Sequence, residues 1–397
     1  MKKRILLFST LSPYPFWAGS EKFWFDLVTD ERTRERFEFH TRLAESPVTR
    51  EKAELLKAAG AEVSFYKHFN VDFMRRNIAR AIDRLAGRTV RTLPWYDEIR
   101  RGKYDLVWFN VDCLNNLQEL EYAVSMCKRK RVPFWLVLQH GSESFFLDSA
   151  SQTEVVEEIS VSASRFVFIA GKNRESLERA VGRRLENAFH SANALTTSEL
   201  RRAGKIAADF PANGERGVRL FSLGRYSTRD KGQHLIIETL SRPEWQRRDW
   251  KMSFVGVDDA GRKQLKRMAI HFGLENSRLD FVAFTNDVYA EIGRHDVLVM
   301  PSLAEGMPFA MIESMASGRP VAGTPVGGIP ELIRDGETGW LARTTDVADI
   351  AVTMERMWSD REKWPEMGSA ARKHVVTYND QTKTHAELLD ALTEDLG

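Results

Sequence analysis

Short apolar runs alternate with amphipathic stretches along most of the chain, and this alternation predicts parallel sheets covered by helices. The runs at residues 5–8, 218–223 and 297–300 lack the polar alternation of a half-exposed strand. We therefore expect these strands to be buried on both faces. A loop and a stretch of apolar positions at helical spacing follow such runs, as at residues 21–29. The pattern predicts repeated strand–helix units and an α/β fold.

Length and composition set the scale of this fold. The chain has 397 residues, so that two domains of roughly 180 to 200 residues fit the usual size range. The net charge of +2 gives no indication of a nucleic-acid partner. Cys113 and Cys127 form no metal-binding or disulfide pattern and favour a reducing compartment. Because no segment reaches the ~20 apolar residues that cross a bilayer, we expect a cytoplasmic protein.

The most informative stretch, residues 296–331, joins a buried strand, a loop and a helix expected over residues 309–317. Ligands of open α/β sheets bind beyond the carboxyl ends of the strands, and a helix N-terminus attracts phosphate. Glu305 lies in the loop and Glu313 in the helix, with seven residues between them. Because a carboxylate only accepts hydrogen bonds, this pair suits the hydroxyl groups of a nucleotide sugar.

This stretch resembles the retaining glycosyltransferases of family 4, which have the GT-B fold and carry two glutamates at this spacing. The resemblance implies that Glu305 contacts the transferred sugar and that Glu313 contacts the ribose of the nucleotide. In the alternative interpretation, Glu305 is an ordinary loop charge and Glu313 a carboxylate on a helix face. The surrounding Pro301, Ser302 and Gly306 favour the functional interpretation.

A second motif follows the strand at residues 218–223. Arg225 comes directly after Gly224, and Lys231 precedes Gly232. In the family that the chain resembles, an arginine and a lysine in this arrangement bind the donor diphosphate; the alternative is surface charge before a helix. A guanidinium pairs with phosphate oxygens in a fork, whereas an ammonium acts as a compact charge. The resemblance places further donor contacts on backbone N–H groups of Gly306, Met307, Phe309 and Ala310.

The N-terminal half offers weaker signals. A loop with Gly19 and Ser20 leads from the first strand into a helix, where the family carries two glycines; Ala18 takes the place of one of them. Gly19 is therefore either part of the donor site or a simple turn glycine. His140 follows another apolar run, at the strand end where the family has a histidine that contacts the sugar; the alternative is an ordinary structural histidine.

The segment from residue 72 to residue 103 is basic. It contains nine Arg or Lys and four Asp or Glu, a net charge of +5 (9 − 4). Apolar positions at helical spacing predict an amphipathic helix. One interpretation is that this helix is an ordinary solvated surface helix. The other is that it binds an anionic membrane surface or a lipid-linked acceptor, and both interpretations remain open.

The resemblance implies a GT-B fold with two Rossmann-like doubly wound domains that face each other across a cleft. We expect an acceptor domain at residues 1–193, a nucleotide-sugar domain at 194–377, and a helix at 378–397 that packs back on the first domain. The expected reaction is sugar transfer with retention from a UDP or GDP sugar to a glycan or lipid-linked hydroxyl in cell-envelope polysaccharide synthesis. We expect no cofactor, no essential metal and, at most, peripheral attachment to the inner face of the plasma membrane.

Three alternatives remain. A GT-B nucleotide-sugar epimerase has the same fold but uses no acceptor. A non-catalytic nucleotide-sugar-binding subunit binds the donor without turnover, and the loss of one glycine beside Gly19 keeps this interpretation open. A dinucleotide-dependent dehydrogenase is disfavoured because no Gly-x-Gly-x-x-Gly follows the first strand.

Overall fold

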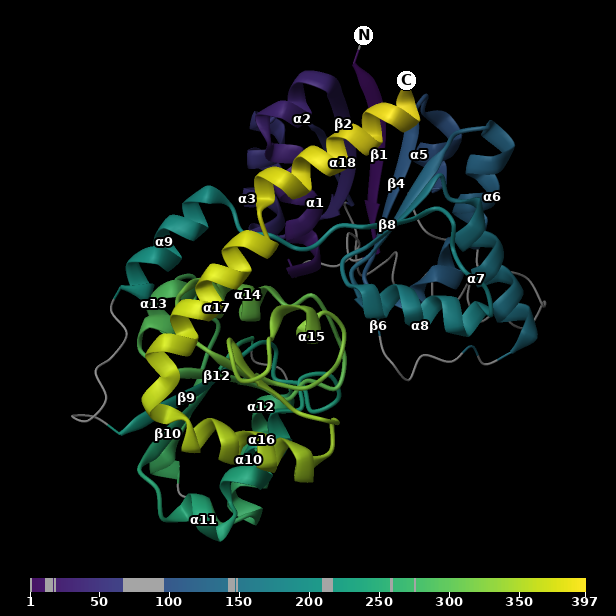
Figure 1. Ribbon diagram of the computed structural model, residues 1–397. Helices are drawn as coiled ribbons and strands as arrows, with labels where there is room; N and C mark the ends of the chain where they lie inside the picture. Colours follow the sequence, from purple (N-terminus) through teal and green to yellow (C-terminus); the bar gives the residue numbers. More distant parts are fainter. Residues whose placement is uncertain are drawn as a thin grey trace. The chain divides into compact units, whose positions relative to one another are not determined.

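The chain forms two compact units in the computed structural model (Figure 1). Unit 1 comprises Met1–Ala192 and Lys383–Gly397, and unit 2 comprises Asn193–Thr382. The structure describes residues 2–10, 17, 19–66, 96–141, 147, 149–208, 217–257, 260–274 and 276–397. Most of the basic segment at 72–103 therefore lies outside the described residues, and so does the helix expected there.

Unit 1 is built on a seven-stranded parallel sheet with the order β3-β2-β1-β4-β5-β7-β8. All six residues of β4 are buried, because both faces of the sheet are covered. A short extended element, β6 (His140–Gly141), follows β5. The strands are β1 (Lys3–Ser9), β2 (Phe37–Ala44), β3 (Glu62–Tyr66), β4 (Leu106–Val111), β5 (Phe134–Leu138), β7 (Arg165–Phe168) and β8 (Ala188–His190).

The helices of unit 1 begin with local capping signals. Ser46 caps α3 through a reciprocal hydrogen-bonded pair with Thr49, and Pro47 stands at the first helical position, where its missing N–H costs nothing. Gly182 ends α8 in the left-handed conformation. The described helices are α1 (Gly19–Thr29), α2 (Glu31–Arg36), α3 (Pro47–Ala58), α5 (Tyr96–Arg101), α6 (Glu121–Lys130), α7 (Ala150–Ser162), α8 (Gly171–Val181) and α18 (Gln381–Leu396).

Unit 2 repeats the architecture with a six-stranded parallel sheet in the order β11-β10-β9-β12-β14-β15. The strands are β9 (Val218–Leu223), β10 (Trp250–Val255), β11 (Leu279–Val282), β12 (Val297–Met300), β14 (Val321–Gly323) and β15 (Gly339–Leu341), with the short β13 (Glu305–Gly306) after β12. The helices are α9 (Thr197–Ala207), α10 (Gln233–Leu240), α11 (Pro243–Gln246), α12 (Ala260–His271), α13 (Val288–Gly293), α14 (Phe309–Ala316), α15 (Ile329–Leu332), α16 (Val347–Ser359) and α17 (Trp364–Tyr378).

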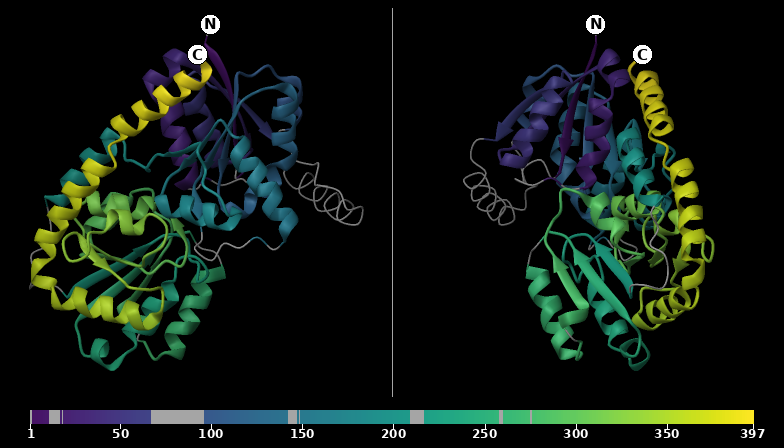
Figure 2. Two further views of the ribbon diagram at one scale, coloured as in Figure 1. Left: turned by 45° about the vertical axis from the view of Figure 1, so that its right-hand side comes forward. Right: turned by 90° about the vertical axis from the view of Figure 1, so that its left-hand side faces the viewer.

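The strand order of each sheet reverses once, as in a doubly wound fold. The reversal falls between β1 and β4 in unit 1 and between β9 and β12 in unit 2. Figure 2 shows the twisted strands of each unit with helices packed against them. Ligands of such sheets bind where the order reverses, outside the carboxyl ends of the strands. We therefore expect a ligand-binding site at one or both of these edges.

The expected α/β fold with two parallel sheets is confirmed, and several strands agree in their bounds with the sequence pattern. One element differs. The sequence pattern starts the last helix at residue 378, whereas α17 continues to Tyr378 and α18 begins only at Gln381. The break falls at Asn379, whose backbone leaves the helical conformation at φ −102° and ψ 45°. The sequence therefore predicts a break between the last two helices but starts the last helix three residues too early (381 − 378).

Helix α18 belongs to unit 1 from Lys383 onward and is fixed there by polar contacts. Asp395 accepts hydrogen bonds from Trp135 Nε1 at 2.7 Å and from the Arg165 guanidinium at 3.0 Å. Near the start of the helix, His385 Nδ1 lies 2.9 Å from an Asp30 oxygen. The pKa of His385 is lowered, first because the ring is buried, although Asp30 acts in the opposite direction.

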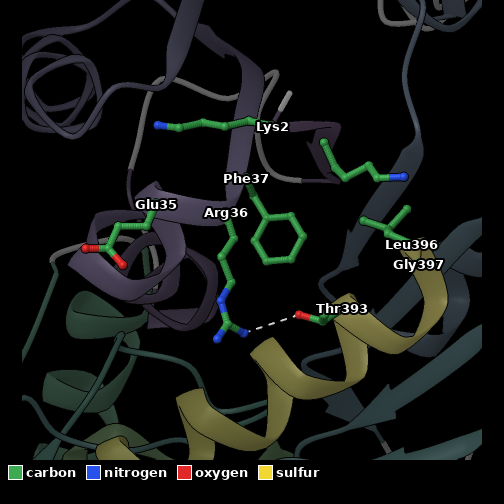
Figure 3. Close-up of a pocket in the computed structure, with 8 residues that line it drawn as sticks. Lys2, Glu35, Arg36, Phe37, Thr393, Leu396 and Gly397 are labelled. Carbon is green, nitrogen blue, oxygen red and sulfur yellow. Dashed lines mark hydrogen bonds between the residues drawn. The ribbon is translucent and has the colours of Figure 1, made fainter.

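A cavity of about 470 Å³ lies at the amino ends of β1 and β2 in unit 1 (Figure 3). The Arg36 guanidinium donates a hydrogen bond to Thr393 Oγ1 at 3.3 Å across it. This cavity is at the opposite end of the strands from the edge where ligands of such sheets bind. Its lining residues are Lys2, Lys3, Glu35, Arg36, Phe37, Thr393, Leu396 and Gly397.

Candidate active site

The centre of the site is an ion pair at the carboxyl edge of the sheet in unit 2. Glu305 follows β12, and its Oε1 accepts hydrogen bonds from Lys231 Nζ at 2.6 Å and from Ser302 Oγ at 2.8 Å. The Glu305 side chain is 5% exposed and that of Lys231 is 21% exposed. The structure therefore brings together two residues that are 74 positions apart in the sequence and that the sequence assigns to the site.

The loop after β9 carries Lys231 and packs directly on the chain after β12. Asp230 O accepts hydrogen bonds from Leu303 N at 2.8 Å and from Ala304 N at 3.2 Å. Gly232 has φ +60°, and a Cβ atom there would lie 1.9 Å from Pro301 O. Only glycine fits this close approach and this conformation, so the packing of the two loops fixes the position of Lys231.

Arg225 lies in the same loop but is more accessible. Its guanidinium is 3.6 Å from Asp230 Oδ2, and its side chain is 64% exposed. Ser227 Oγ lies 3.3 Å from the same Asp230 oxygen. Because the pair is exposed, Asp230 holds Arg225 only weakly, and the guanidinium remains open to an anionic ligand.

A second glycine loop supports the backbone around Glu305. Gly327 has φ +53°, and a Cβ atom there would lie 2.3 Å from Glu305 O. Gly328 N donates a hydrogen bond to Gly306 O at 2.6 Å. The close contact with Glu305 O leaves no room for a side chain at Gly327, which is why this residue is a glycine.

Helix α14 begins immediately after this loop. Pro308 is its N-cap, and no side-chain hydrogen bond caps the helix. Phe309 and Ala310, in the first turn, are partly buried. Met307, the residue before Pro308, is 2% exposed, so that it is almost fully buried. An uncapped helix start at the carboxyl edge presents N–H groups and a positive dipole end to an anion.

Glu313 lies in the second turn of α14 and is partly buried. Its charge acts on Tyr289, a buried residue of α13 that the sequence does not single out. The pKa of Tyr289 is raised, mainly because the hydroxyl is buried and further because Glu313 and Glu199 are negative. Tyr289 is missed because a tyrosine in an amphipathic helix is typical of ordinary core packing.

The other predicted residues belong to unit 1. His140 lies at the end of β5, in β6, and is partly buried. A Cβ atom on the next residue, Gly141, would lie 2.6 Å from Asn173 Oδ1, which explains the glycine. Gly19 and Ser20 form the start of α1, and Ser20 O accepts a hydrogen bond from Asn110 Nδ2 at 3.4 Å.

A buried polar cluster connects these segments of unit 1, and the sequence does not predict it. Gln139 Nε2 donates to Asn110 Oδ1 at 2.8 Å, and Asn110 Nδ2 contacts Ser9 Oγ at 3.4 Å. Ser9 Oγ and Trp24 Nε1 then donate to the two oxygens of Glu21, the latter at 2.6 Å. Single polar residues at strand ends carry no spacing signal, so that only the packed sheet edge reveals the cluster.

Burial perturbs the carboxyl group at the end of this cluster. Glu21 is 2% exposed. Desolvation raises its pKa to about 7, and the negative charge of Asp112 acts in the same direction. The hydrogen bonds from Ser9 and Trp24 oppose the shift because they stabilise the charged form. Glu21 therefore titrates close to neutral pH.

The described residues contain no group of three or more His, Cys, Asp or Glu side chains that could hold a metal ion. Within the same parts of the chain, no helix is long and apolar enough to cross a membrane.

The fold is that of GT-B glycosyltransferases. The chain aligns over 99% of its length with all of a protein from Anabaena, Alr3699/HepE, crystallised with UDP and glucose; the TM-score is 0.69 and the identity 19%. A glycosyltransferase from Rickettsia africae aligns with a TM-score of 0.73 at 15% identity and covers 100% of this chain, which covers 99% of that one.

Sequence comparison matches one segment of the chain to a family. Residues 217–360 match the family model of glycosyl transferases group 1. A D-inositol 3-phosphate glycosyltransferase from Streptomyces coelicolor is 39% identical over 82 residues, which are 21% of this chain and 18% of that protein. The putative colanic acid biosynthesis glycosyltransferase WcaL of Salmonella typhimurium is 28% identical over 174 residues, 42% of each chain. The segment at 217–360 is thus similar to the group 1 glycosyltransferases, which confirms the resemblance.

The matched region contains Arg225, Lys231, Glu305 and Glu313, whereas His140, Gly19 and Ser20 lie outside it. The chain spans less than half the length of the curated relatives it matches. These partial matches do not assign roles to individual residues, so the roles proposed below are argued from the contacts within each unit.

Proposed function

We propose that the protein is a glycosyltransferase that moves a sugar from a nucleotide diphosphate to a hydroxyl group of a glycan or lipid-linked acceptor. The observation that carries this proposal is the Lys231–Glu305 pair at 2.6 Å, beside the uncapped start of α14. In this proposal, a cation that would bind the diphosphate lies next to a carboxylate that would bind a sugar hydroxyl. The group 1 family match of the same segment supports it.

The diphosphate would be held by two cations and by backbone groups. Lys231 has three N–H donors, so that it can keep its bond to Glu305 while it contacts a phosphate oxygen. Arg225 can turn its exposed guanidinium from Asp230 to the ligand. The N–H groups of Gly306, Met307, Phe309 and Ala310 would add hydrogen bonds, whereas Pro308 has none to give.

The sugar and the ribose would be held by acceptors. Lys231 and Ser302 both contact Oε1 of Glu305, so that Oε2 has no hydrogen-bond partner within the described residues and can accept from a sugar hydroxyl. Glu313 would accept from the ribose. His140, Gly19 and Ser20 of unit 1 are proposed to complete the sugar site.

The nucleobase would lie near the ends of β10 and β11. Val257 is 49% exposed and Phe284 is 66% exposed, and each lies two residues after the end of one of these strands. Exposed apolar surface of this size at a ligand edge is suited to stacking against a base. The Anabaena protein of the same fold was crystallised with UDP, which supports a uridine donor.

The proposed reaction proceeds with retention and without an essential metal. The bond between the anomeric carbon and the diphosphate oxygen breaks, and its electron pair leaves with the nucleoside diphosphate. The acceptor oxygen bonds to the same face of the anomeric carbon, and its proton passes to the departing phosphate oxygen. Lys231 and Arg225 would stabilise the negative charge of the leaving group. Full turnover in the presence of EDTA and an unchanged anomeric configuration are the expected results.

The acceptor is proposed to be a growing cell-envelope polysaccharide or its lipid-linked precursor. Relatives named for colanic acid and amylovoran biosynthesis support this class. Attachment to the inner face of the plasma membrane through the basic segment remains part of this proposal. Charge reversal at Arg75, Arg76, Arg80 and Arg84 should abolish binding to anionic vesicles; unchanged binding would remove the membrane contact from the proposal.

The donor site is tested by the shift of the thermal unfolding midpoint with UDP, GDP and ADP sugars. A ligand at a hundredfold excess over its dissociation constant stabilises the folded state by about 2.7 kcal/mol. We expect a shift with one nucleotide that is lost in Glu313→Ala. Glu238→Ala is the matched control, because Glu238 is also a partly buried helical glutamate of unit 2, near the C-terminus of α10.

Turnover separates the proposal from the alternatives. A glycosyltransferase releases nucleoside diphosphate only when an acceptor is present. An epimerase would isomerise the sugar without an acceptor, and a binding subunit would shift the midpoint without any turnover. No shift with any donor, for a well-folded protein, would contradict the proposed function.

A further inference from the structure

Two buried asparagines stand beside the places where the chain passes between the units. Unit 2 begins at Asn193 and ends at Thr382. Asn379 lies between α17 and α18, near the second passage. A parallel bridge between Leu195 and Asp380 pairs the two segments within unit 2. The first and last segments of the unit thus run side by side.

The same asparagines are bonded to the loop that carries Glu305. Asn193 Nδ2 donates to Met307 O at 2.7 Å, and Asn379 Nδ2 donates to Asn193 O at 2.6 Å. Asn379 Nδ2 also lies 3.4 Å from Met307 Sδ. The three residues are 3%, 1% and 2% exposed, so that water does not weaken these contacts. A short hydrogen-bonded chain therefore joins both segments to the residue two positions after Glu305.

The bonding pattern fixes the orientation of both amides. Each Nδ2 faces a carbonyl oxygen, which can only accept. The two Oδ1 atoms are buried and have no hydrogen-bond partner among the residues that the structure describes. An unpaired buried acceptor lowers stability, so that stability alone does not account for two such amides in one cluster. The Nδ2 group of each asparagine makes the hydrogen bonds of this cluster, whereas the Oδ1 group makes none to the described residues.

The opposite side of the loop is held by other contacts. Gly328 N bonds Gly306 O at 2.6 Å, and Lys231 bonds Glu305 at 2.6 Å. The backbone from Glu305 to Pro308 is thus held between the glycine loop and the asparagine pair, with little freedom to shift. A shift of this backbone caused at the Lys231 side would therefore also move the Met307 carbonyl that Asn193 binds.

We infer that Asn193 and Asn379 are positioning residues that hold the Glu305–Pro308 loop in its binding shape and couple it to the two segments where the chain leaves unit 2. The inference rests on the proposed function in one respect, since it takes this loop to be the donor site. Neither asparagine is expected to touch the donor. Their effect would reach it through the Met307 carbonyl and the adjoining N–H groups of Gly306 and Phe309.

Amide hydrogen exchange of the full chain tests the inference. Removal of the Asn379 side chain in Asn379→Ala should raise exchange about tenfold at residues 305–310 and at residues 193–197 together. Asn379→Ser, which keeps a shorter donor, should give a smaller effect and replaces the alanine variant if that variant does not fold. Asn193→Ala should act in the same two segments.

Asn187→Ala is the matched control. Asn187 is a partly buried residue of unit 1, and its Nδ2 also bonds two backbone carbonyls, those of Ser160 at 2.9 Å and Ala163 at 2.8 Å. It should raise exchange only near itself. If the Asn379 variants change exchange at residues 305–310 no more than this control does, the inference is wrong.

Donor binding provides the second arm. In the wild type, the donor chosen by the thermal-shift panel should slow exchange at residues 305–310 and also at 193–197. In Asn379→Ala, the donor KM should rise about tenfold while kcat changes less, because the loop is shifted rather than chemically altered. A purely structural pair would lower the unfolding midpoint and leave KM unchanged, which would overturn the inference.

The two arms keep this inference separate from the proposed function. If no donor binds the wild type, the proposed function fails, whereas the exchange of the free protein still decides whether the asparagines hold the loop. If the donor binds and turns over but the two segments respond independently, the proposed function stands and the inference falls.

Discussion

The carboxyl edges of the two sheets have the same topology and different chemistry. In unit 1, Ser9, Asn110 and Gln139 extend from strand ends into a buried cluster that ends at Glu21. In unit 2, the equivalent edge carries the Lys231–Glu305 pair and the exposed Arg225. Within the described residues, the side chains at the first edge bond mainly to one another, whereas the second edge presents positive charge to a ligand.

The comparison shows that topology alone does not make a phosphate site. Both sheets reverse their order where such sites occur. Only in unit 2 do the loops that follow β9 and β12 supply cations, and the close contact of Gly232 with Pro301 packs those loops against each other. In unit 1 the described polar groups bond mainly to one another and supply no cation, which suits a surface that shapes a site without binding a diphosphate.

We call the carboxyl edge of unit 2, with Arg225, Lys231 and Glu305, the charged edge. Removal of the Lys231 cation from this edge should have the largest effect. Lys231→Ala leaves the Glu305 carboxylate, 5% exposed, with Ser302 as its partner. Loss of one member of a buried pair costs about 3 kcal/mol. We expect a stability loss near this value and no binding of UDP, as measured by urea unfolding and by titration calorimetry.

A paired substitution separates these two losses. Lys231→Met with Glu305→Gln removes both charges and should recover most of the stability, because no buried charge is left alone. It should not recover UDP binding. Binding of UDP to Lys231→Ala with the affinity of the wild type would show that the charged edge is not the diphosphate site.

The next effect concerns the carboxyl edge of unit 1, here called the neutral edge, where the polar cluster ends at Glu21. This effect depends on pH. The pKa of Glu21 is raised from 4.5 to about 7 in the folded state. As the pH rises from 4.5 towards 7, the unfolded chain loses this proton before the folded one, so that stability falls. The shift corresponds to about 3 kcal/mol, which is fully lost above the folded pKa. Glu21→Gln cannot ionise and should not show this decline.

Hydrogen exchange in β1 and β4 between pH 5 and pH 8, corrected for intrinsic rates, measures this difference in the unit that holds Glu21. The free energy of opening of the wild type should fall relative to that of Glu21→Gln as the pH rises. Asp112→Asn should flatten the wild-type slope partly, because Asp112 raises the same pKa. Parallel pH profiles for the wild type and Glu21→Gln would mean that the carboxyl group is not desolvated as described.

The sequence predicts the charged edge better than the neutral one, for a physical reason. Strands such as β9 and β12 are continuous apolar runs with bounds that the pattern gives directly. Lys231 and Glu305 sit in loops whose glycines and spacing form a motif. The cluster around Glu21 has no motif, because its members come from separate strands and meet only through packing.

The asparagine pair shows the same limit more sharply. Asn193 and Asn379 are 186 positions apart, and each is an ordinary polar residue between two elements. Asn379 lies at the break between α17 and α18; the sequence predicts a break close to this position but not the hydrogen bonds that Asn379 makes there. Such features are set by contacts distant in the chain, which a reading of local periodicity does not contain.

The smallest expected effect tests how far the charged edge extends. Arg225 is 64% exposed and its pair with Asp230 is 3.6 Å long, so that Arg225→Ala should leave stability almost unchanged. If the guanidinium contacts the diphosphate, the affinity for UDP should fall about tenfold, or by about 1.4 kcal/mol. The loss should shrink at high salt, because screening already weakens the wild-type contact. Arg229→Ala, an exposed arginine of the same loop, is the control. Equal losses for both variants would mean that Arg225 contributes only general positive charge, and that the specific part of the site ends at Lys231.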